Sequence, residues 1–177
     1  GANPLALGVS VTGFFDRGLK RILFSSASPM GAVDLAPVLG RAGDTPVELN
    51  SDVHAMAVRW MIRQARSEEE DVLVVSLEDG AVGASFLVGG RPNRGCVLGG
   101  NELGHMRLGV ETERCYCGGV GCVERVFSTA FLNRSGDART LSEALSRRQL
   151  SDSAQRIVEG LATALVNATV FARPSHL

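Results

Sequence analysis

Three cysteines fall within eight residues, at Cys115, Cys117 and Cys122, and His105 precedes them by ten positions. Three thiolates and one imidazole fill the four positions of a tetrahedral zinc ion, and a site with four protein ligands is structural because no position stays open for water or substrate. The glycines between the cysteines let the backbone curl, including at positive φ, and their amides can donate to the thiolates: Gly118, Gly119 and Gly121. The spacing therefore predicts a zinc knuckle that fixes an irregular loop and the helix after it.

Two other interpretations of these cysteines stay open. In the first they are inert buried residues in a glycine loop. In the second they form a disulfide, although Cys115 and Cys117 are too close in sequence to bridge without strain. A chain of 177 residues, of which 45% are apolar, does not need disulfides to hold a core. Cys96 lies outside the cluster, and we expect it to be a small buried residue.

The composition is that of an ordinary globular protein with one or two domains. Charged residues make up 21% of the chain and its formal net charge is −1, which argues against a nucleic-acid surface within this segment. The most apolar run, Gly160–Ala172, is too short to span a membrane, and the N-terminus lacks the pattern of a signal peptide. We therefore expect a cytoplasmic protein without a membrane segment. Lys20 is the only lysine, which hints at a GC-rich, and so bacterial, coding sequence.

Short apolar segments bounded by glycine, proline and polar residues predict strands. The segments concerned are Ala6–Gly13, Arg21–Phe24, Pro46–Leu49, Val72–Leu77 and Ala84–Val88. The last two are separated by the turn residues Glu78–Gly80 and form a predicted hairpin. A turn is expected at Ser28–Gly31, and irregular backbone over the glycine-rich residues Gly89–Gly109.

Helical periodicity and capping residues predict helices between and after these strands. They cover Val33–Leu39, Val53–Arg66, Cys122–Leu132, Leu141–Arg147 and Ser151–Ala172. Strands that alternate with helices indicate an α/β architecture. The charged run Ser67–Asp71 is the best boundary. It divides the chain into residues 1–67, part of a first α/β lobe, and residues 68–177, a second lobe that carries the knuckle.

Two carboxylates flank the predicted knuckle. Glu102 precedes His105 by three residues, and Glu124 follows Cys122 by two. Carboxylates accept hydrogen bonds from adjacent hydroxyl groups, and the metal would hold these side chains in one geometry. Two rigidly placed carboxylates beside an imidazole suit a polyol ligand.

The run Glu102-Leu-Gly-His105, followed by Cys115-x-Cys117-Gly-x-x-Gly-Cys122-x-Glu124, resembles the signature of the ROK family (repressors, open reading frames, kinases). The resemblance extends from about Gly8 to about Pro174 and is strongest at the knuckle. It implies the α/β fold of sugar kinases, which is also called the actin-like ATPase or ribonuclease H-like fold. In this chain we expect that fold to be truncated at both ends. It also implies that the zinc ligands are His105, Cys115, Cys117 and Cys122.

The same resemblance implies roles for four side chains in the ligand site. Glu102, His105 and Glu124 would contact the sugar, with His105 touching both metal and ligand through its two nitrogens. Asp52 matches the position of the family's catalytic base, which in the kinases takes the proton from the attacking sugar hydroxyl. In the alternative interpretation, Asp52 has no catalytic role and is an acidic residue at the start of a helix, where the helix dipole favours a negative charge.

The chain departs from the family pattern at the second phosphate loop, which in the family is a Gly-Thr-Gly-x-Gly turn. The matching residues are Glu78–Val82 or Asp79–Gly83, and only one of three glycines remains in either register. Side chains then stand where the backbone must approach phosphate, and Asp79 would repel it. Two like charges about 4 Å apart repel by roughly 1 kcal/mol in water and by about 4 kcal/mol at an effective dielectric constant of 20. We therefore expect poor binding of Mg-ATP.

Two further departures affect the ligand site. Ser51 and His54 stand where the family has asparagines. These changes weaken the match at the ligand site, and we expect His54 to be an incidental residue of the helix.

These departures favour the sugar-sensing effector domain of a ROK-type transcriptional regulator that has lost kinase activity. Its ligand would be a small sugar, zinc would be a structural cofactor, and an upstream helix-turn-helix domain outside this chain would bind DNA. The alternative is a ROK sugar kinase that phosphorylates hexoses with ATP. In a third interpretation the knuckle is purely structural and the protein binds no sugar. The resemblance also implies a homo-oligomer, commonly a dimer.

Overall fold

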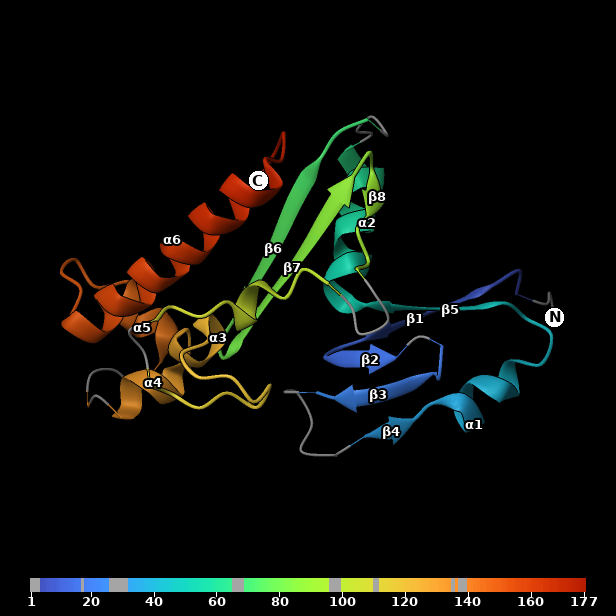
Figure 1. The fold of residues 1–177 in the computed structure, drawn as a ribbon, viewed down its shortest axis with the longest axis horizontal. Coiled ribbons are helices and arrows are strands. Elements are labelled where there is room, and N and C mark those ends of the chain that lie inside the picture. Colours follow the sequence, from blue (N-terminus) through green and yellow to red (C-terminus); the bar gives the residue numbers. More distant parts are fainter. Residues whose placement is uncertain are drawn as a thin grey trace.

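The computed structural model describes most of the chain, namely residues 4–16, 18–25, 32–64, 69–95, 100–109, 112–134, 136 and 140–177. The expected turn at Ser28–Gly31 and the expected burial of Cys96 lie outside the described residues. The same holds for the boundary at 67/68, so the division into residues 1–67 and 68–177 stays a prediction. The expected mixture of strands and helices is confirmed (Figure 1).

A parallel strand pair and the helix after it place the first candidate site residue. Strand β1 (Leu7–Val11) pairs with β5 (Val47–Ser51) in parallel, from Leu7 opposite Val47 to Val11 opposite Ser51. Helix α2 (Asp52–Gln64) begins at the residue directly after β5. The carboxyl ends of parallel strands meet at one edge of a sheet, where ligands bind in many α/β proteins. Asp52 stands at this edge, and so does Thr12, which follows β1.

A small antiparallel sheet follows β1. It has the order β2-β3-β4 and consists of β2 (Phe14–Asp16), β3 (Arg21–Phe24) and β4 (Val33–Asp34). The predicted helix over Val33–Leu39 is wrong in its first half, because Val33 and Asp34 pair with β3. The Asp34 carboxylate accepts a hydrogen bond from the Ala36 amide at 2.9 Å, and Pro37 at the start of the helix has no amide hydrogen to donate. Helix α1 (Ala36–Leu39) therefore begins only at Ala36, and the short helix η1 (Gly40–Ala42) follows it.

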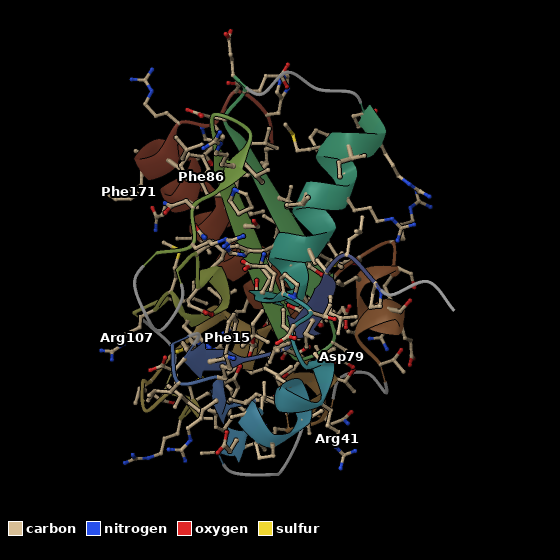
Figure 2. All side chains as sticks on the ribbon, turned by 90° about the vertical axis from the view of Figure 1, so that its right-hand side faces the viewer. Phe15, Arg41, Asp79, Phe86, Arg107 and Phe171 are labelled. Atoms are coloured by element: carbon tan, nitrogen blue, oxygen red, sulfur yellow. The ribbon has the colours of Figure 1, made fainter. Side chains whose placement is uncertain are left out.

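The side chains of this first part form a small core between the parallel pair and the antiparallel sheet. Val11, Phe15 and Leu49 are buried there. Figure 2 shows Phe15 inside this part of the molecule, whereas Arg41 points away from the ribbon.

A long hairpin forms the centre of the molecule (Figure 1). Strands β6 (Val72–Glu78) and β7 (Ala81–Val88) are antiparallel, and the short β8 (Arg91–Pro92) extends the sheet beside β7. Strand β7 begins three residues before the predicted Ala84, because Glu78 pairs directly with Ala81. The turn therefore contains only Asp79 and Gly80, and Gly80 takes a φ of +74° that favours glycine.

Helix α2 packs against this hairpin. Ala57 and Met61 of α2 form a buried cluster with Val72 of β6 and Leu87 of β7. Gly83 allows the close approach, since a Cβ there would lie 2.5 Å from a methyl carbon of Val53. The helix that begins at Asp52 is thus fixed on the same strands that carry the Asp79–Gly80 turn.

The C-terminal part consists of helices that pack on the other side of the hairpin. The predicted single helix Cys122–Leu132 is wrong in the middle, because it is divided into α3 (Val123–Val126) and α4 (Thr129–Arg134). The Phe127 carbonyl accepts a hydrogen bond from the Gly80 amide at 3.0 Å instead of continuing the helix. The Ser128 hydroxyl then accepts from the Phe131 amide at 3.2 Å and starts the second helix.

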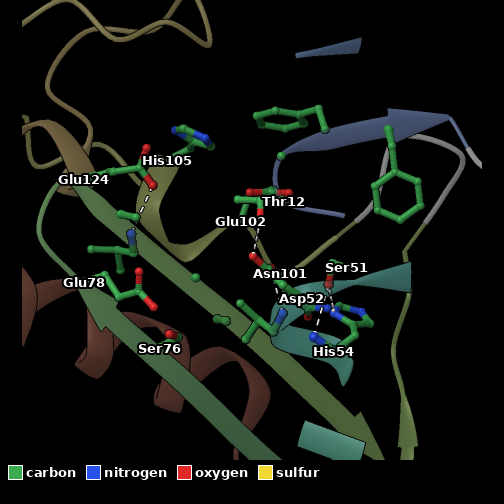
Figure 3. Close-up of a pocket in the computed structure, with 18 of the residues that line it drawn as sticks. Thr12, Ser51, Asp52, His54, Ser76, Glu78, Asn101, Glu102, His105 and Glu124 are labelled. Atoms are coloured by element: carbon green, nitrogen blue, oxygen red, sulfur yellow. Dashed lines mark hydrogen bonds between the residues drawn. The ribbon is translucent and has the colours of Figure 1, made fainter. Parts of the chain in front are cut away.

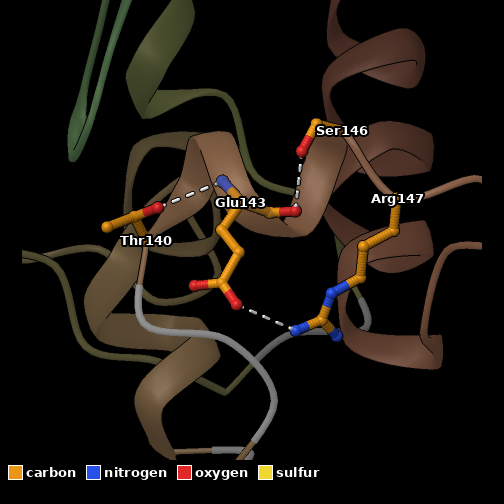
Figure 4. A network of polar contacts seen from close by, with 4 residues as sticks. All are labelled: Thr140, Glu143, Ser146 and Arg147. Atoms are coloured by element: carbon orange, nitrogen blue, oxygen red, sulfur yellow. Dashed lines mark hydrogen bonds and ion pairs between the residues drawn. The ribbon is translucent and has the colours of Figure 1, made fainter.

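Helices α5 (Leu141–Leu145) and α6 (Asp152–Ala172) match their predicted segments closely. Thr140 accepts a hydrogen bond from the Glu143 amide, and Glu143 forms an ion pair with Arg147 (Figure 4). Buried side chains from the hairpin, from Leu103 before the knuckle and from α3 to α6 make up the largest core among the described residues, including Val82, Leu132 and Ile157. Among the described residues, no helix combines the length and apolarity that crossing a membrane requires.

Candidate functional site

A cavity of about 380 Å³ lies between the edge of the parallel pair, the hairpin turn and the segment before the knuckle. The four predicted ligand-site residues all line it, although they come from separate parts of the chain: Asp52, Glu102, His105 and Glu124. Figure 3 shows them around the same space. The structure therefore brings the predicted residues together.

Asp52 is held at the first residue of α2. Its Oδ2 atom accepts a hydrogen bond of 2.6 Å from the Thr12 hydroxyl, and its Oδ1 accepts one of 2.7 Å from the Val53 amide (Figure 3). A carboxylate at a helix N-terminus is favoured by the helix dipole. Asp52 thus has a fixed orientation at the cavity wall.

Glu102 precedes the short helix η2 (Leu103–His105) and faces two other acids. Desolvation in the cavity, followed by the negative charges of Glu124 and Asp52, raises the pKa of Glu102 to about 7. Three carboxylates therefore converge on one space, and one of them titrates near neutral pH. Such a group accepts hydrogen bonds as a carboxylate and donates one when protonated.

Glu124 lies on α3 and is 6% exposed. Its Oε2 atom accepts a hydrogen bond of 3.1 Å from the Val82 amide of β7, and its Oε1 accepts one from the Tyr116 hydroxyl. Burial raises the pKa of Glu124. Gly104 makes room for this arrangement, because a Cβ there would lie 2.3 Å from the Val82 carbonyl oxygen.

The predicted metal ligands converge beside this cavity. The donor atoms of all four side chains lie within 4.8 Å of one another, so the group could hold a metal ion: His105, Cys115, Cys117 and Cys122. The Sγ atoms of Cys117 and Cys122 are 3.7 Å apart, and Cys115 Sγ is 3.5 Å from His105 Nδ1. Zinc bonds of about 2.3 Å to sulfur and roughly 2.0–2.1 Å to nitrogen give tetrahedral edges of about 3.8 and 3.6 Å. The two measured edges match this geometry.

The backbone between the cysteines is shaped by its glycines. Gly118 and Gly121 have φ values of +86° and +73°. Gly119 leaves room for two cysteine side chains, because a Cβ there would lie 3.3 Å from the sulfurs of both Cys117 and Cys122. Its amide donates to Cys117 Sγ at 3.4 Å, as expected for amides in a metal knuckle.

The protonation of the donor atoms fits a cation site. Burial lowers the pKa of His105, so its ring stays neutral at pH 7 and keeps a lone pair. Burial, followed by the neighbouring thiols of Cys117 and Cys115, raises the pKa of Cys122 to about 12. A buried thiolate at this position therefore needs a positive partner, which a divalent cation would supply.

Ser51 and His54 also line the cavity. The His54 side chain is buried, and its Nδ1 atom lies 2.7 Å from the Ser51 hydroxyl oxygen (Figure 3). The Ser51 hydroxyl also accepts a hydrogen bond from the His54 amide at 3.2 Å. These two contacts join Ser51 to the first turn of α2. His54 is therefore a residue of this helix, as expected.

The turn between β6 and β7 is bound to the helices behind it. Asp79 Oδ1 accepts a hydrogen bond of 2.6 Å from the Thr129 amide, and its Oδ2 accepts one of 2.5 Å from the Thr129 hydroxyl. The Gly80 amide donates to the Phe127 carbonyl. The expectation that Asp79 would face phosphates thus needs correction, since both of its carboxylate oxygens are bound to the start of α4.

We expect Asp79→Ala to lower stability, because it removes the side chain that caps α4. A lost helix cap costs about 1 kcal/mol, which for a chain of this size lowers the melting temperature by roughly 2–4 °C. Thermal unfolding monitored by circular dichroism measures the shift. Glu78→Ala is the matched control, and equal melting temperatures for the two variants would contradict the capping role of Asp79.

Two residues of the site were not predicted. Tyr116 lies between two predicted metal ligands and contacts both His105 and Glu124, and Thr12 binds Asp52. Its position between Cys115 and Cys117 could have indicated Tyr116, because a residue between two metal ligands stays close to the knuckle. Nothing in the sequence around Thr12 indicates its distant partner.

Comparison with known proteins gives relatives of two kinds. The xylose repressor of Bacillus subtilis is 26% identical over 163 residues, which cover 92% of this chain and 41% of the repressor. The N-acetylmannosamine kinase of Vibrio cholerae is 27% identical over 166 residues, which cover 93% of this chain and 56% of the kinase. The chain thus spans about half the length of these relatives.

The solved structures include similar folds. The ROK hexokinase of Thermus thermophilus has a TM-score of 0.70 and 25% identity, and the match covers 96% of this chain and 60% of the hexokinase. This similarity confirms the predicted sugar-kinase-like α/β fold. The model of the ROK family matches residues 2–177. The chain therefore belongs to the ROK family.

Proposed function

We propose that this chain is the sugar-binding effector domain of a ROK-type transcriptional regulator and that it does not transfer phosphate. The turn between β6 and β7 carries this proposal. In a phosphate-binding loop, free backbone amides point at the phosphate. Here the Gly80 amide donates to Phe127, the Val82 amide to Glu124 and the Thr129 amide to Asp79.

The charge at the turn adds to the loss of free amides. Glu78, the last residue of β6, lines the cavity beside the turn, where phosphates would have to approach. Its carboxylate repels phosphate oxygens, and the repulsion grows as water is excluded. Nucleotide binding is therefore opposed both by the bonds that occupy the Gly80 and Val82 amides and by the charge of Glu78.

Three other carboxylates of the cavity suit a sugar. Glu102, Glu124 and Asp52 offer carboxylate oxygens to one space, and hydroxyl groups of a sugar are the matching donors. His105 directs its Nδ1 toward Cys115. In our proposal this nitrogen binds the metal, and Nε2 is left for the ligand.

The metal in this proposal is zinc in a structural role. The Cys₃His donor set and its two measured edges support zinc, and four protein ligands leave no open position for catalysis. Zinc would hold His105 and the start of α3 in place, and with them Glu124. The metal would thereby shape the sugar site without contacting phosphate.

The regulator would bind DNA through an upstream helix-turn-helix domain and act in the cytoplasm. The similarity to the xylose repressor supports this part of the proposal. Sugar binding would change DNA affinity only if the sugar binds two conformations of the protein with different affinities. A homo-oligomer, which the family resemblance implies, stays a prediction.

A sugar kinase is the second candidate. The Asp52 carboxylate, fixed by Thr12 and the Val53 amide, has the position that a general base for a sugar hydroxyl needs. The similarity to the N-acetylmannosamine kinase is of the same order as the similarity to the repressor. A kinase would also have to bind Mg-ATP at the turn between β6 and β7.

Calorimetry separates the two candidates. We expect the chain to bind at least one of D-xylose, D-glucose and N-acetyl-D-mannosamine, and the full-length protein to show no heat with Mg-ATP in the presence or absence of sugar. The full-length protein should release no ADP when sugar is added. Sugar-dependent ADP release would support the kinase, and absence of binding to every sugar would contradict both candidates.

A further inference from the structure

Tyr116 occupies a junction between the metal cluster and the cavity. It lies between two of the cluster cysteines and lines the cavity. Its ring stacks on Phe24 of β3, with centroids 4.4 Å apart and planes at 18°. It also meets the His105 ring edge-on, at 5.1 Å and 87°. The ring is therefore held on two sides by aromatic contacts.

The Tyr116 hydroxyl completes the fixation of Glu124. It donates to Glu124 Oε1, while the Val82 amide donates to Oε2. Each carboxylate oxygen has two lone pairs, so one acceptor position remains on each oxygen. With both oxygens held by donors on the protein, the carboxylate cannot rotate, and its free acceptor positions point in fixed directions.

The aromatic contacts also connect two parts of the fold across the cavity. Phe14 lies opposite Phe24 in the β2–β3 pair, and it stacks on His105 with centroids 5.2 Å apart. The two phenylalanines come from the small sheet, and the two other rings come from the knuckle segment. Phe14, His105 and Tyr116 all line the cavity, so this end of the space has an apolar wall beside the carboxylates.

We propose that Tyr116 is a positioning residue for carbohydrate recognition. Its hydroxyl orients Glu124 as an acceptor for hydroxyl groups of the ligand, and the Phe24 stack holds the phenol in place. The proposal rests on the sugar-binding function proposed above and adds a residue to it. A purely structural Tyr116 would stabilise the knuckle through its ring alone, and its hydroxyl would not affect the ligand.

Tyr116→Phe tests the hydroxyl with the ring kept. Loss of a hydrogen bond to a charged group that binds ligand should weaken sugar binding about tenfold. Titration calorimetry of the 177-residue chain with D-xylose, D-glucose and N-acetyl-D-mannosamine measures this change. Metal content should equal that of the wild-type chain, since the ring and its aromatic contacts are kept. Tyr116→Ala also removes the ring and should weaken binding further while lowering the melting temperature.

A spectroscopic measurement tests the contact without sugar. Tyr116 is the only tyrosine of this 177-residue chain, so 3-fluorotyrosine gives a single fluorine resonance. We expect this resonance to shift in Glu124→Gln and to remain unchanged in the control Glu78→Gln. In the wild-type chain it should also shift when a binding sugar is added.

The outcomes separate this proposal from the one on which it rests. If the wild-type chain binds sugar and Tyr116→Phe binds it equally well, the positioning role is overturned and the sugar-binding function stands. An unchanged resonance in Glu124→Gln overturns the positioning role as well. If the wild-type chain binds none of the three sugars, the proposed function fails, and the role of Tyr116 fails with it.

Discussion

Replacement of Cys122 by serine should abolish metal binding and unfold the knuckle. Cys122 has no exposed surface and its sulfur lies 3.7 Å from that of Cys117, so its loss would leave the ion with three of its four predicted ligands. Binding of structural zinc contributes about 10–16 kcal/mol in small zinc domains at pH 7. Loss of even a third of that lowers the melting temperature of a chain of this size by roughly 10 °C. Elemental analysis should give one zinc per wild-type chain and none in Cys122→Ser.

Cys96→Ser is the matched control, since it removes the one cysteine of the sequence that is not among the four predicted metal ligands. It should keep one zinc per chain and the wild-type melting temperature. A strong chelator added to the wild-type chain should reproduce the effect of Cys122→Ser. Equal zinc content in Cys122→Ser and the wild type would show that the four side chains do not form the metal site.

The knuckle could be predicted from sequence because its chemistry is local. Cys115, Cys117 and Cys122 can reach one ion only if the glycines between them turn the chain, and both residue types are visible in a single short segment. His105 was predictable for the same reason, because the nine residues between it and Cys115 leave it within reach. The measured convergence of the four donor atoms agrees with this reasoning.

The errors in the fold arise where a distant partner competes with a local preference. Val33 and Asp34 were assigned to the helix that follows them, yet they pair with β3, which lies earlier in the chain. The helix expected over Cys122–Leu132 is divided because the Phe127 carbonyl accepts from Gly80, which lies in another element. Neither partner can be recognised from the helical segment itself.

The correction at Asp79 has the same origin. An acidic residue in a hairpin turn was expected to face phosphate, because the turn was compared only with the phosphate loop it replaces. The structure shows that Thr129, fifty residues later, binds both carboxylate oxygens. The hydrogen bonds of Tyr116 and Thr12 to their acidic partners likewise depend on how separate elements meet.

Glu102→Gln should weaken sugar binding strongly and at the same time make the folded chain more stable. Glu102 is placed as an acceptor in the cavity, and loss of charged hydrogen bonds worth about 1.5–3 kcal/mol each weakens binding by about 100-fold. Desolvation and the charges of Glu124 and Asp52 oppose the ionised form of this residue. The neutral amide does not carry that cost, so the melting temperature at pH 8 should rise.

The pH dependence follows from the raised pKa of Glu102, which is about 7 against an ordinary value of 4.5. Between these two values the folded chain binds more protons than the unfolded chain, so the contribution of Glu102 to stability falls as pH rises through this window. Sugar binding should change in the opposite direction, because the carboxylate is the stronger acceptor. Affinity should be up to about tenfold lower at pH 6 than at pH 8, with a midpoint near pH 7.

Glu78→Gln is the matched control, because it removes a carboxylate that lines the same cavity but is not one of the three proposed sugar acceptors. It should keep the sugar affinity of the wild type and the pH dependence of that affinity. Glu102→Gln should have a lower affinity that does not change between pH 6 and pH 8. Calorimetric titrations at pH 6, 7 and 8, with melting curves at the same pH values, measure both effects. Equal losses of affinity in the two variants would mean that the total charge of the cavity, and not a contact with Glu102, determines sugar binding.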